Sequence, residues 1–415
     1  MSDNEQLAHT PKCKGLSFLT GEGHFVRMVA SSVLHFSILF AVALVRSIAA
    51  ERVKLPSAVV LTAGGVLAAA LWHVEVPFAF GPALLFVFLP PLIFEAAWTI
   101  DLTLVRKHLA AITFLALPGT VVGALVVGGV VAWTGLLPWS EALLLAAIVS
   151  ATDPVAVTAV FRSLHAPRAI RATVEAESIG NDGVGVVLYG IALALTAGAA
   201  VPWYHAVAQG TIAVIMGCVV GVVCAVPLWL GLAATESSEY EVAGTVALAY
   251  VSYLAAASQG WSGIFASASA AVALRVLQRR RAHLQHRERI ANFWHAAAYM
   301  TNAVVFLATG MSISVLRIAD APQLAAVVLV AIVVVRAGLA FIAVRERAAA
   351  TIILTAGVRG ALPLALALAL PPSLPHRDSI VDAVFAVVIV TLVVQGGILR
   401  AILRWVATWT RTASD

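Results

Sequence analysis

The sequence predicts an all-α polytopic membrane protein with about thirteen transmembrane helices. Three observations lead to this fold class: the composition, a succession of long apolar segments, and the placement of basic residues between those segments. Of the 415 residues, 61% are hydrophobic and 11% are charged, whereas an average soluble domain carries about 25% charged residues. Such a chain lacks the polar residues that a soluble surface needs. With a net charge of only +5, the composition excludes a soluble enzyme, a disordered regulator and a nucleic-acid binder.

The apolar segments define the predicted spans, because a helix that crosses the hydrocarbon core needs about 20 mostly apolar residues. Residues 1–28 are polar and are expected to form an extracytoplasmic tail without a cleavable signal peptide. Residues 409–415 are expected to form a short cytoplasmic tail. The membrane transport domain is predicted over residues 29–408, with spans at 29–49, 55–72, 83–98, 110–134, 140–162, 169–198, 206–233, 242–257, 260–277, 291–316, 322–344, 348–371 and 379–408.

The basic residues give the orientation of these spans. Nineteen of the 26 Lys and Arg residues follow odd-numbered spans or lie at the C-terminus, five lie on the opposite side, and two lie inside spans. Because Lys and Arg gather on the cytoplasmic side, the N-terminus is predicted outside and the C-terminus in the cytoplasm. An error in the number of spans would distribute the Lys and Arg residues over both sides of the membrane and remove this asymmetry. The sequence has no organelle signal, which favours a bacterial inner membrane.

Ionisable side chains inside the spans are the first candidates for function. A charge at the bilayer centre costs about 2.5–3.5 kcal/mol on insertion scales, so such residues are functional candidates by default. At a rise of about 1.5 Å per residue, Glu95, Asp153, Asp182 and Arg359 fall in the middle zone of the bilayer. Arg336, nearer a helix end, is expected to serve packing or a cytoplasmic funnel. The buried candidates are Glu95, Asp153, Glu177, Asp182 and Arg359.

The motif around Asp182 offers ligands for a small cation. Ser178 and Asp182 share one helix face, and Glu177 and Asn181 share the adjacent face, rotated by about 100°. The first face presents a hydroxyl and a carboxylate, which are hard oxygen ligands. The second presents a carboxylate and an amide to partner groups elsewhere. The alternative is a polar pair that joins two helices, although such a contact rarely needs two carboxylates at the midplane.

Two spans are interrupted by Pro and Gly. In the fifth, Pro154 follows Asp153, and in the twelfth Gly360 follows Arg359. Proline frees carbonyls of the preceding turn, which are tolerated only against protein or a water-filled cavity. Freed carbonyls beside Thr152 would suit sodium, and an ordinary kink is the alternative. Interrupted spans at matching positions predict inverted repeats, here about 29–198 and 242–408, joined by a connector helix at 206–233.

At these motifs the sequence resembles the NhaP/NHE-type monovalent cation:proton antiporters, from about residue 30 to residue 405. Each motif alone is weak, and their combination is specific. The residues that carry the resemblance are Pro90 to Glu95, Ala151 to Val157, Glu177 and Ser178 followed by Asn181 to Val187, Asn302 with Phe306 and Gly310, and Arg359 and Gly360 leading into Leu364 to Leu368. The sequence departs from the usual family pattern at Gly180, where a bulky residue is common, at Ala356, often Trp, and at His295, often an acid.

The resemblance implies a thirteen-helix homodimer with a moving core domain, in which helices 5 and 12 cross and are partly unwound. It implies that Asp182 binds the cation or the proton. Ser178, Asp153 and the carbonyl of Thr152 would complete the Na⁺ site, with Glu95 acting directly or through water. Three further roles follow from the resemblance: Glu177 would pair with Arg359, Asn181 would be the amide typical of electroneutral members, and Asn302 would support the site.

The expected function is secondary active antiport of Na⁺ or Li⁺ against H⁺, with 1:1 electroneutral stoichiometry and alternating access at Asp182. The expected partners are monovalent cations, protons and membrane lipid, and neither a cofactor nor enzymatic activity is expected. The nearest alternative is a K⁺/H⁺ antiporter of the same fold. An intramembrane aspartyl protease would need a Gly-x-Gly-Asp stretch, but Asn181 precedes Asp182. A cation channel would repeat its filter around a symmetry axis, and the sequence has one asymmetric acidic cluster.

Overall fold

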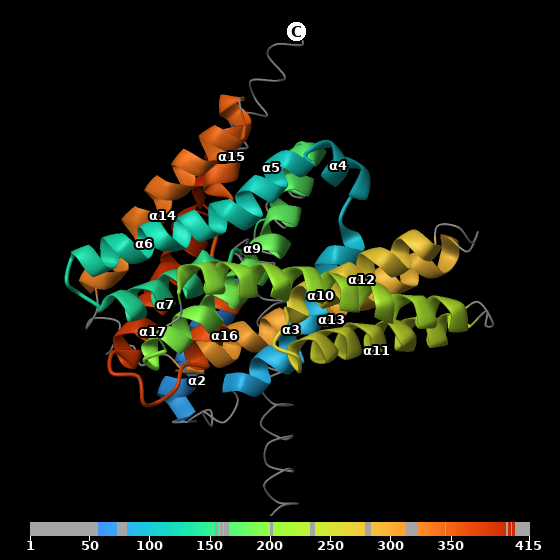
Figure 1. Cartoon of the computed structure of the whole chain (residues 1–415), viewed down its shortest axis with the longest axis horizontal. Coiled ribbons are helices and arrows are strands. Elements are labelled where there is room, and N and C mark those ends of the chain that lie inside the picture. Colours follow the sequence, from blue (N-terminus) through green and yellow to red (C-terminus); the bar gives the residue numbers. More distant parts are fainter. Residues whose placement is uncertain are drawn as a thin grey trace, which may run out of the picture.

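The computed structural model describes residues 57–72, 81–153, 157, 161, 166–199, 202–232, 237–278, 284–312, 322–344, 346–395, 397–399 and 401–402. Within these ranges helices are the only regular secondary structure (Figure 1). The predicted first span, both predicted tails and Pro154 lie outside the described residues.

Helices occupy the regions in which the other twelve spans were predicted. In the first half they are α2 (Ser57–Trp72), α3 (Gly81–Thr99), α4 (Leu102–Lys107), α5 (Leu109–Phe114), η2 (Leu115–Gly119), α6 (Thr120–Trp133), α7 (Trp139–Ser150) and α9 (Arg168–Thr196). The second half holds α10 (Trp203–Leu232), α11 (Ser238–Ala257), α12 (Gly263–Gln278), α13 (Leu284–Ser312), α14 (Pro322–Ala343), α15 (Arg347–Thr355), α16 (Ala361–Leu368), α17 (Arg377–Val390) and η3 (Thr391–Gln395).

Six helical stretches in the described residues are long and apolar enough to cross a membrane. They are Leu109–Trp133, Arg168–Thr196, Tyr204–Leu232, Glu239–Ala257, Pro322–Ala343 and Arg377–Leu399. Shorter apolar helices at Phe86–Thr99, Trp139–Ser150 and Gly263–Gln278 accompany them. Large apolar side chains on the outside, among them Ile212, Val223 and Val334, are the surface that lipid requires.

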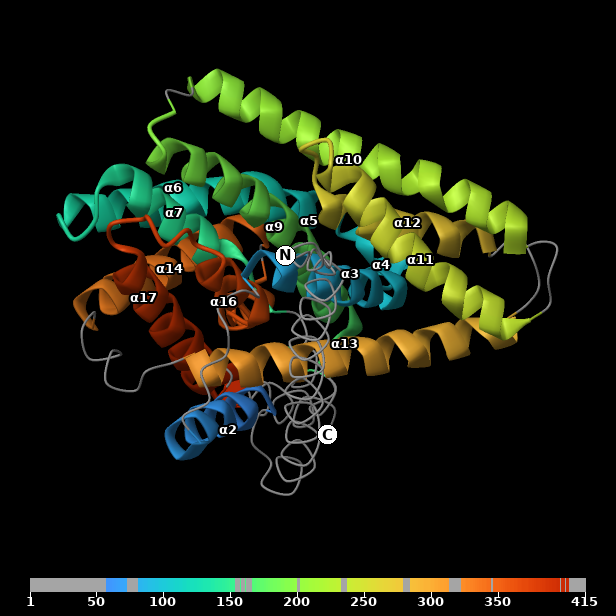
Figure 2. The same ribbon diagram turned by 90° about the horizontal axis from the view of Figure 1, so that it is seen from below.

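The helices pack into two bundles. The first, which we call the scaffold bundle, consists of α2, α3 and α10 to α13. The second, which we call the site bundle, consists of α5, η2, α6, α7, α9 and α14 to α17 (Figure 2). Helix α9 borders both, because it also contacts α3, α10 and α12.

Local sequence explains the irregular elements. Pro118 lies in η2, a π-helical turn between α5 and α6, and proline removes the N–H that a regular turn would use. The hydroxyl of Thr120 donates to the carbonyl of Ala116 at 2.8 Å and satisfies one of the displaced acceptors. At the end of α3, the buried Arg275 of α12 donates to the carbonyls of Trp98 and Ile100, where the helix dipole favours a positive charge.

Candidate functional site

The breaks in the fifth and twelfth predicted spans meet in the site bundle. Helix α7 ends at Ser150 and continues as extended backbone, with ψ of 139° at Ala151. The second break lies between α15 and α16. The N–H of Asp153 donates to the carbonyl of Val358 at 2.8 Å and ties the two unwound segments together. A Cβ at Gly360 would collide with the Asp153 carboxylate, so this close approach depends on glycine.

Two carboxylates lie side by side at the crossing. Asp182 of α9 is 6% exposed and Asp153 is 7% exposed. The charges of Asp153 and Arg359 both act on Asp182, and the backbone of Thr152 interacts with its carboxylate. The Oδ1 atom of Asp182 is buried and has no hydrogen-bond partner among the described residues. Because buried acceptors are normally satisfied, this oxygen is a candidate ligand for a cation or acceptor for a proton.

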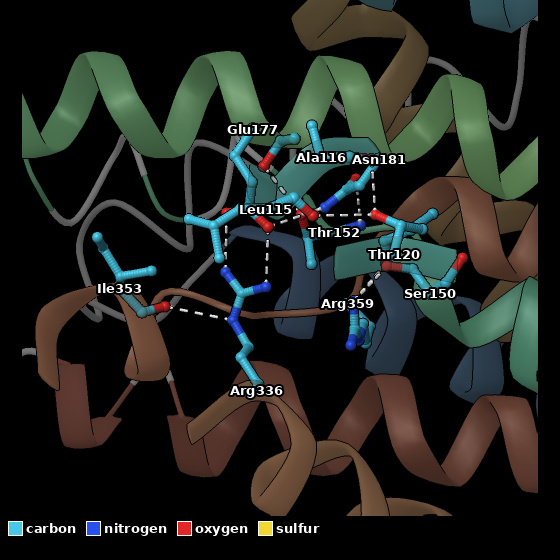
Figure 3. Close-up of polar contacts among 12 residues, drawn as sticks. Leu115, Ala116, Thr120, Ser150, Thr152, Glu177, Asn181, Arg336, Ile353 and Arg359 are labelled. Carbon is cyan, nitrogen blue, oxygen red and sulfur yellow. Dashed lines mark hydrogen bonds and ion pairs between the residues drawn. The ribbon is translucent and has the colours of Figure 1, made fainter. Parts of the chain in front are cut away.

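A network of short hydrogen bonds joins α9 to the end of α7 (Figure 3). The hydroxyls of Thr152 and Ser178 lie 2.9 Å apart. The amide of Asn181 donates to the hydroxyl of Thr152 at 2.7 Å and to Glu177 at 3.2 Å, and its Oδ1 accepts from the N–H of Thr152 at 3.3 Å. The hydroxyl and N–H of Thr152 therefore position α9. The carbonyl oxygen of Thr152 takes part in no hydrogen bond between described residues.

The ion pair of Glu177 corrects the sequence-based expectation. Glu177 pairs with Arg336 of α14 through two hydrogen bonds of 2.9 and 3.0 Å, and not with Arg359. Arg336 also donates to the carbonyl of Ile353 at 3.2 Å. The prediction was wrong because charge alone does not distinguish two arginines. Both Arg336 and Arg359 lie inside apolar spans, so the sequence carries no signal that separates them as partners of Glu177.

Arg359 instead binds the frayed end of α7. Its Nη1 donates to the carbonyls of Ser150 and Ala151 at 2.7 and 3.1 Å, and its N–H donates to the hydroxyl of Thr391 at 3.2 Å. The last carbonyls of a helix lack partners and carry the negative end of its dipole. A buried guanidinium there satisfies these carbonyls and places a positive charge near Asp182.

Glu95 and Asn302 lie on the scaffold bundle. The Glu95 carboxylate of α3 is 3.3 Å from Nδ1 of His295 on α13. Asn302 follows His295 by seven residues on α13, so both lie on one helix face, and the Asn302 amide is buried with no partner for Nδ2 in the described part of the chain. The structure thus separates Glu95 and Asn302 by bundle from Asp153, Ser178 and Asp182, which it brings together.

The charges of the five ionisable side chains around the crossing of the unwound segments do not balance. Asp153, Glu177 and Asp182 supply three carboxylates, and Arg336 and Arg359 supply two guanidiniums. With all five ionised, the cluster carries one uncompensated negative charge. One proton or one monovalent cation at the carboxylate pair would neutralise it.

A cavity of about 50 Å³ lies behind the Glu177–Arg336 pair. Apolar residues of η2, α6 and α14 form most of its wall, and Asn181 and Arg359 contribute polar groups. A cavity of this size with polar partners is large enough to hold water. Water there would hydrate the ion pair.

Comparisons with known proteins bear on the family and the fold of this chain. The family model described as "Sodium/hydrogen exchanger, transmembrane" matches residues 37–405. The Na⁺/H⁺ antiporter ApNhaP of Aphanothece halophytica is 31% identical over 260 residues, 60% of this chain and 49% of that protein. The Na⁺/H⁺ antiporter NhaP of Pseudomonas aeruginosa is 30% identical over 309 residues, 69% of this chain and 73% of that protein.

Among solved structures, the sodium proton antiporter MjNhaP1 of Methanocaldococcus jannaschii has the same fold, with a TM-score of 0.78. The match covers 90% of this chain and 98% of that chain, at 18% identity. The chain spans about half the length of the cyanobacterial relatives that it matches, with 49% of one and 48% of another.

Proposed function

Because the chain belongs to the sodium/hydrogen exchanger family of transmembrane transporters, we propose that it exchanges Na⁺ or Li⁺ for H⁺, one for one and without net charge movement. As a member of this family it is a transporter rather than an enzyme. The observation that carries the proposal is the buried pair of Asp153 and Asp182 inside a cluster with one uncompensated negative charge.

The proposed cycle follows from the cost of burying charge. With Asp182 ionised and empty, the cluster is charged, and moving it past the apolar scaffold bundle is expensive. One proton or one cation removes that charge, so only the loaded states cross. Because the site moves only when it is neutral, it exchanges a proton for a cation and does not transport either one alone.

The proposed cation ligands are the carboxylates of Asp153 and Asp182, the hydroxyl of Ser178 and the carbonyl of Thr152. Oxygen donors of this kind suit hard monovalent cations. The hydrogen bonds of Asn181 to the hydroxyl and N–H of Thr152 support the assignment, because they fix the backbone that would present this carbonyl. Glu95 would act through water or directly from the scaffold bundle, and Asn302 would support the site from α13.

We further propose the setting in which this exchange takes place. The basic residues favour an N-terminus outside and a C-terminus in the cytoplasm. The protein is proposed to be a homodimer in a bacterial inner membrane. Its two inverted repeats are proposed to be joined by the connector helix α10. The side of the molecule at which α10 begins is then the outer side.

The test uses purified protein in liposomes with an acidified lumen and a pH-sensitive dye. Addition of Na⁺ or Li⁺ outside should restore dye fluorescence equally with the membrane potential clamped and unclamped. Asp182→Asn should abolish this response, and Asp378→Asn, an exposed carboxylate at the start of α17, should preserve it. A response to K⁺ alone would favour K⁺/H⁺ exchange, and survival of the response in Asp182→Asn would refute the assignment.

A further inference from the structure

A hydroxyl group at the end of α17 reaches the break between α15 and α16. Thr391 is the polar residue in an otherwise apolar run, residues 383–394, and it is buried. It lies where α17 ends and the π-helical turn η3 begins. Its hydroxyl accepts a hydrogen bond of 3.2 Å from the N–H of Arg359, 32 positions earlier in the chain.

The N–H of Arg359 needs this acceptor because the helix is broken at residues 356–360, which we call the linker. In a continuous helix this N–H would donate to the carbonyl four residues earlier, which belongs to Thr355, the last residue of α15. Buried backbone N–H groups are almost always paired, and in the core of a membrane no water replaces a missing partner. Thr391 supplies the acceptor that the broken helix lacks.

The hydroxyl of Thr391 is oriented as an acceptor by its own helix. It donates its proton to the carbonyl of Val388 at 3.0 Å, which is a common arrangement for a hydroxyl inside a helix. With the proton committed there, the lone pairs of the oxygen remain for other groups. The N–H of Arg359 therefore meets an acceptor and not a second donor.

The linker that Thr391 anchors is in contact with one of the proposed cation ligands. Directly before Arg359, the carbonyl of Val358 accepts from the N–H of Asp153 at 2.8 Å. Directly after it, the backbone of Gly360 lies so close to the Asp153 carboxylate that a Cβ would collide with it. A displacement of the Arg359 backbone would therefore change both contacts of Asp153.

The side chain of Arg359 extends the same link to α7. Its Nη1 donates to the carbonyls of Ser150 and Ala151 at 2.7 and 3.1 Å, so the unwound end of α7 and the linker hold each other. The end of α7 is also tied to α9 through Asn181. Thr391 is the corresponding tie between the linker and α17.

We propose that Thr391 is a positioning residue of the cation site, whose hydroxyl fixes the linker so that Asp153 stays in its cation-binding position. This inference rests on the proposed function and adds a residue of the last helix to the groups that determine cation affinity. Thr391 acts through the backbone of Arg359 and not by contact with the cargo. Its loss should weaken cation binding and leave the movement of the loaded site unchanged.

The first test separates affinity from rate in proteoliposomes. Thr391→Val removes the hydroxyl and keeps the shape of the side chain, so the apparent KM for Na⁺ should rise by roughly tenfold with an unchanged maximal rate. Thr391→Ser retains the hydroxyl and should keep the wild-type KM. A wild-type KM in Thr391→Val would overturn the proposal, and so would an equal rise in Thr391→Ser.

Thr173→Val is the matched control. Thr173 is also buried, and its hydroxyl donates to the carbonyl of Ala169 at 2.9 Å within α9. Among the described residues, no other helix donates a hydrogen bond to this hydroxyl. The control should keep the wild-type KM, and a rise equal to that in Thr391→Val would contradict a specific role of Thr391.

The second test measures cation binding without transport. Na⁺ bound to the folded protein raises its melting temperature, which is followed in detergent at constant ionic strength. The Na⁺ concentration that gives a fixed rise should be roughly tenfold higher in Thr391→Val and unchanged in Thr391→Ser. Equal concentrations in the wild type and Thr391→Val would overturn the positioning role. Stabilisation of the wild type by Na⁺ without cation-driven proton flux would instead refute the proposed function and leave this comparison intact.

The third test asks whether Thr391 acts through the linker. Gly360→Ala displaces the Asp153 carboxylate directly, so adding Thr391→Val should raise the Na⁺ requirement little further, because substitutions that act on one group are not additive. Fully additive effects would contradict a shared path through Asp153. Thr391→Ala, which also removes the hydroxyl, should reproduce the value of Thr391→Val from a smaller side chain, and a wild-type value there would overturn the proposal.

Discussion

Arg336 of α14 holds Glu177 of α9 through two hydrogen bonds of 2.9 and 3.0 Å, and this pair fixes the helix that carries Asp182. Glu177 also accepts from the amide of Asn181 at 3.2 Å, so the pair is linked to Thr152 and to the unwound end of α7 (Figure 3). A buried charge network of this kind is costly to break, because either partner alone would be left uncompensated.

We therefore predict that Arg336→Ala destabilises the protein by about 3–5 kcal/mol. The measurement is thermal unfolding in detergent. Arg171→Ala is the matched control, because Arg171 forms a partly exposed pair with Glu175 at 3.4 Å, and such pairs contribute about 0.2–1 kcal/mol. Equal losses in the two variants would show that the Glu177–Arg336 pair does not anchor α9.

A second prediction concerns the glycine beside Asp153. Gly360→Ala should displace the Asp153 carboxylate, because the added methyl group would occupy its position. The apparent KM for Na⁺ should rise by roughly a hundredfold, the scale of a misplaced ligand, while the protein still folds. The assay is dye recovery against Na⁺ concentration. Gly338→Ala in α14, where a Cβ would meet nothing within 4 Å, should retain the wild-type KM.

A third prediction concerns pH. If proton and cation share Asp182, the protonated carboxylate cannot bind Na⁺. The apparent KM for Na⁺ should then rise by about tenfold for each pH unit below the apparent pKa of the site, with an unchanged maximal rate. Transport rates at several Na⁺ concentrations, measured across a pH series, give both constants. A KM independent of pH would mean that the two cargos use different sites.

A fourth prediction concerns the departure from the family pattern at Gly180. A Cβ here would lie 2.6 Å from the Cβ of Ala116 in η2, so this chain packs η2 closely against α9. Gly180→Ala should lower the melting temperature, and adding Ala116→Gly should restore it, whereas Gly190→Ala on the exposed side of α9 should have little effect. Independent effects of the two substitutions would show that these helices do not touch there.

Much of the site could be predicted because its chemistry is local. Glu177, Ser178, Asn181 and Asp182 are buried on one helix, and helical periodicity alone assigns them to two adjacent faces. The interruption of the fifth and twelfth spans could also be predicted from Pro and Gly in apolar segments. The predicted fold class is confirmed by the helical architecture and its match to a solved antiporter. The repeat boundaries and the roles of the individual ligands stay predictions.

The long-range pairings could not be predicted. Arg336 and Arg359 are both guanidiniums inside apolar spans, and only the packing of α14 within the site bundle decides that Arg336 reaches Glu177 while Arg359 binds the carbonyls of α7. Likewise, nothing in the sequence around Gly183 indicates Phe265, because the two are 82 residues apart in the printed chain and meet only through the packing of α9 on α12.

The membrane location, the positions of the helices and the burial of Glu95, Asp153, Glu177 and Asp182 could be predicted from the sequence alone, because the cost of burying charge and the helical period act residue by residue. The pairing of arginines with acids, the meeting of the two unwound segments and the contact of the Phe265 ring with Gly183 follow from tertiary packing alone. These contacts depend on how distant helices cross, and pairwise attraction between charges or apolar surfaces does not specify the partner.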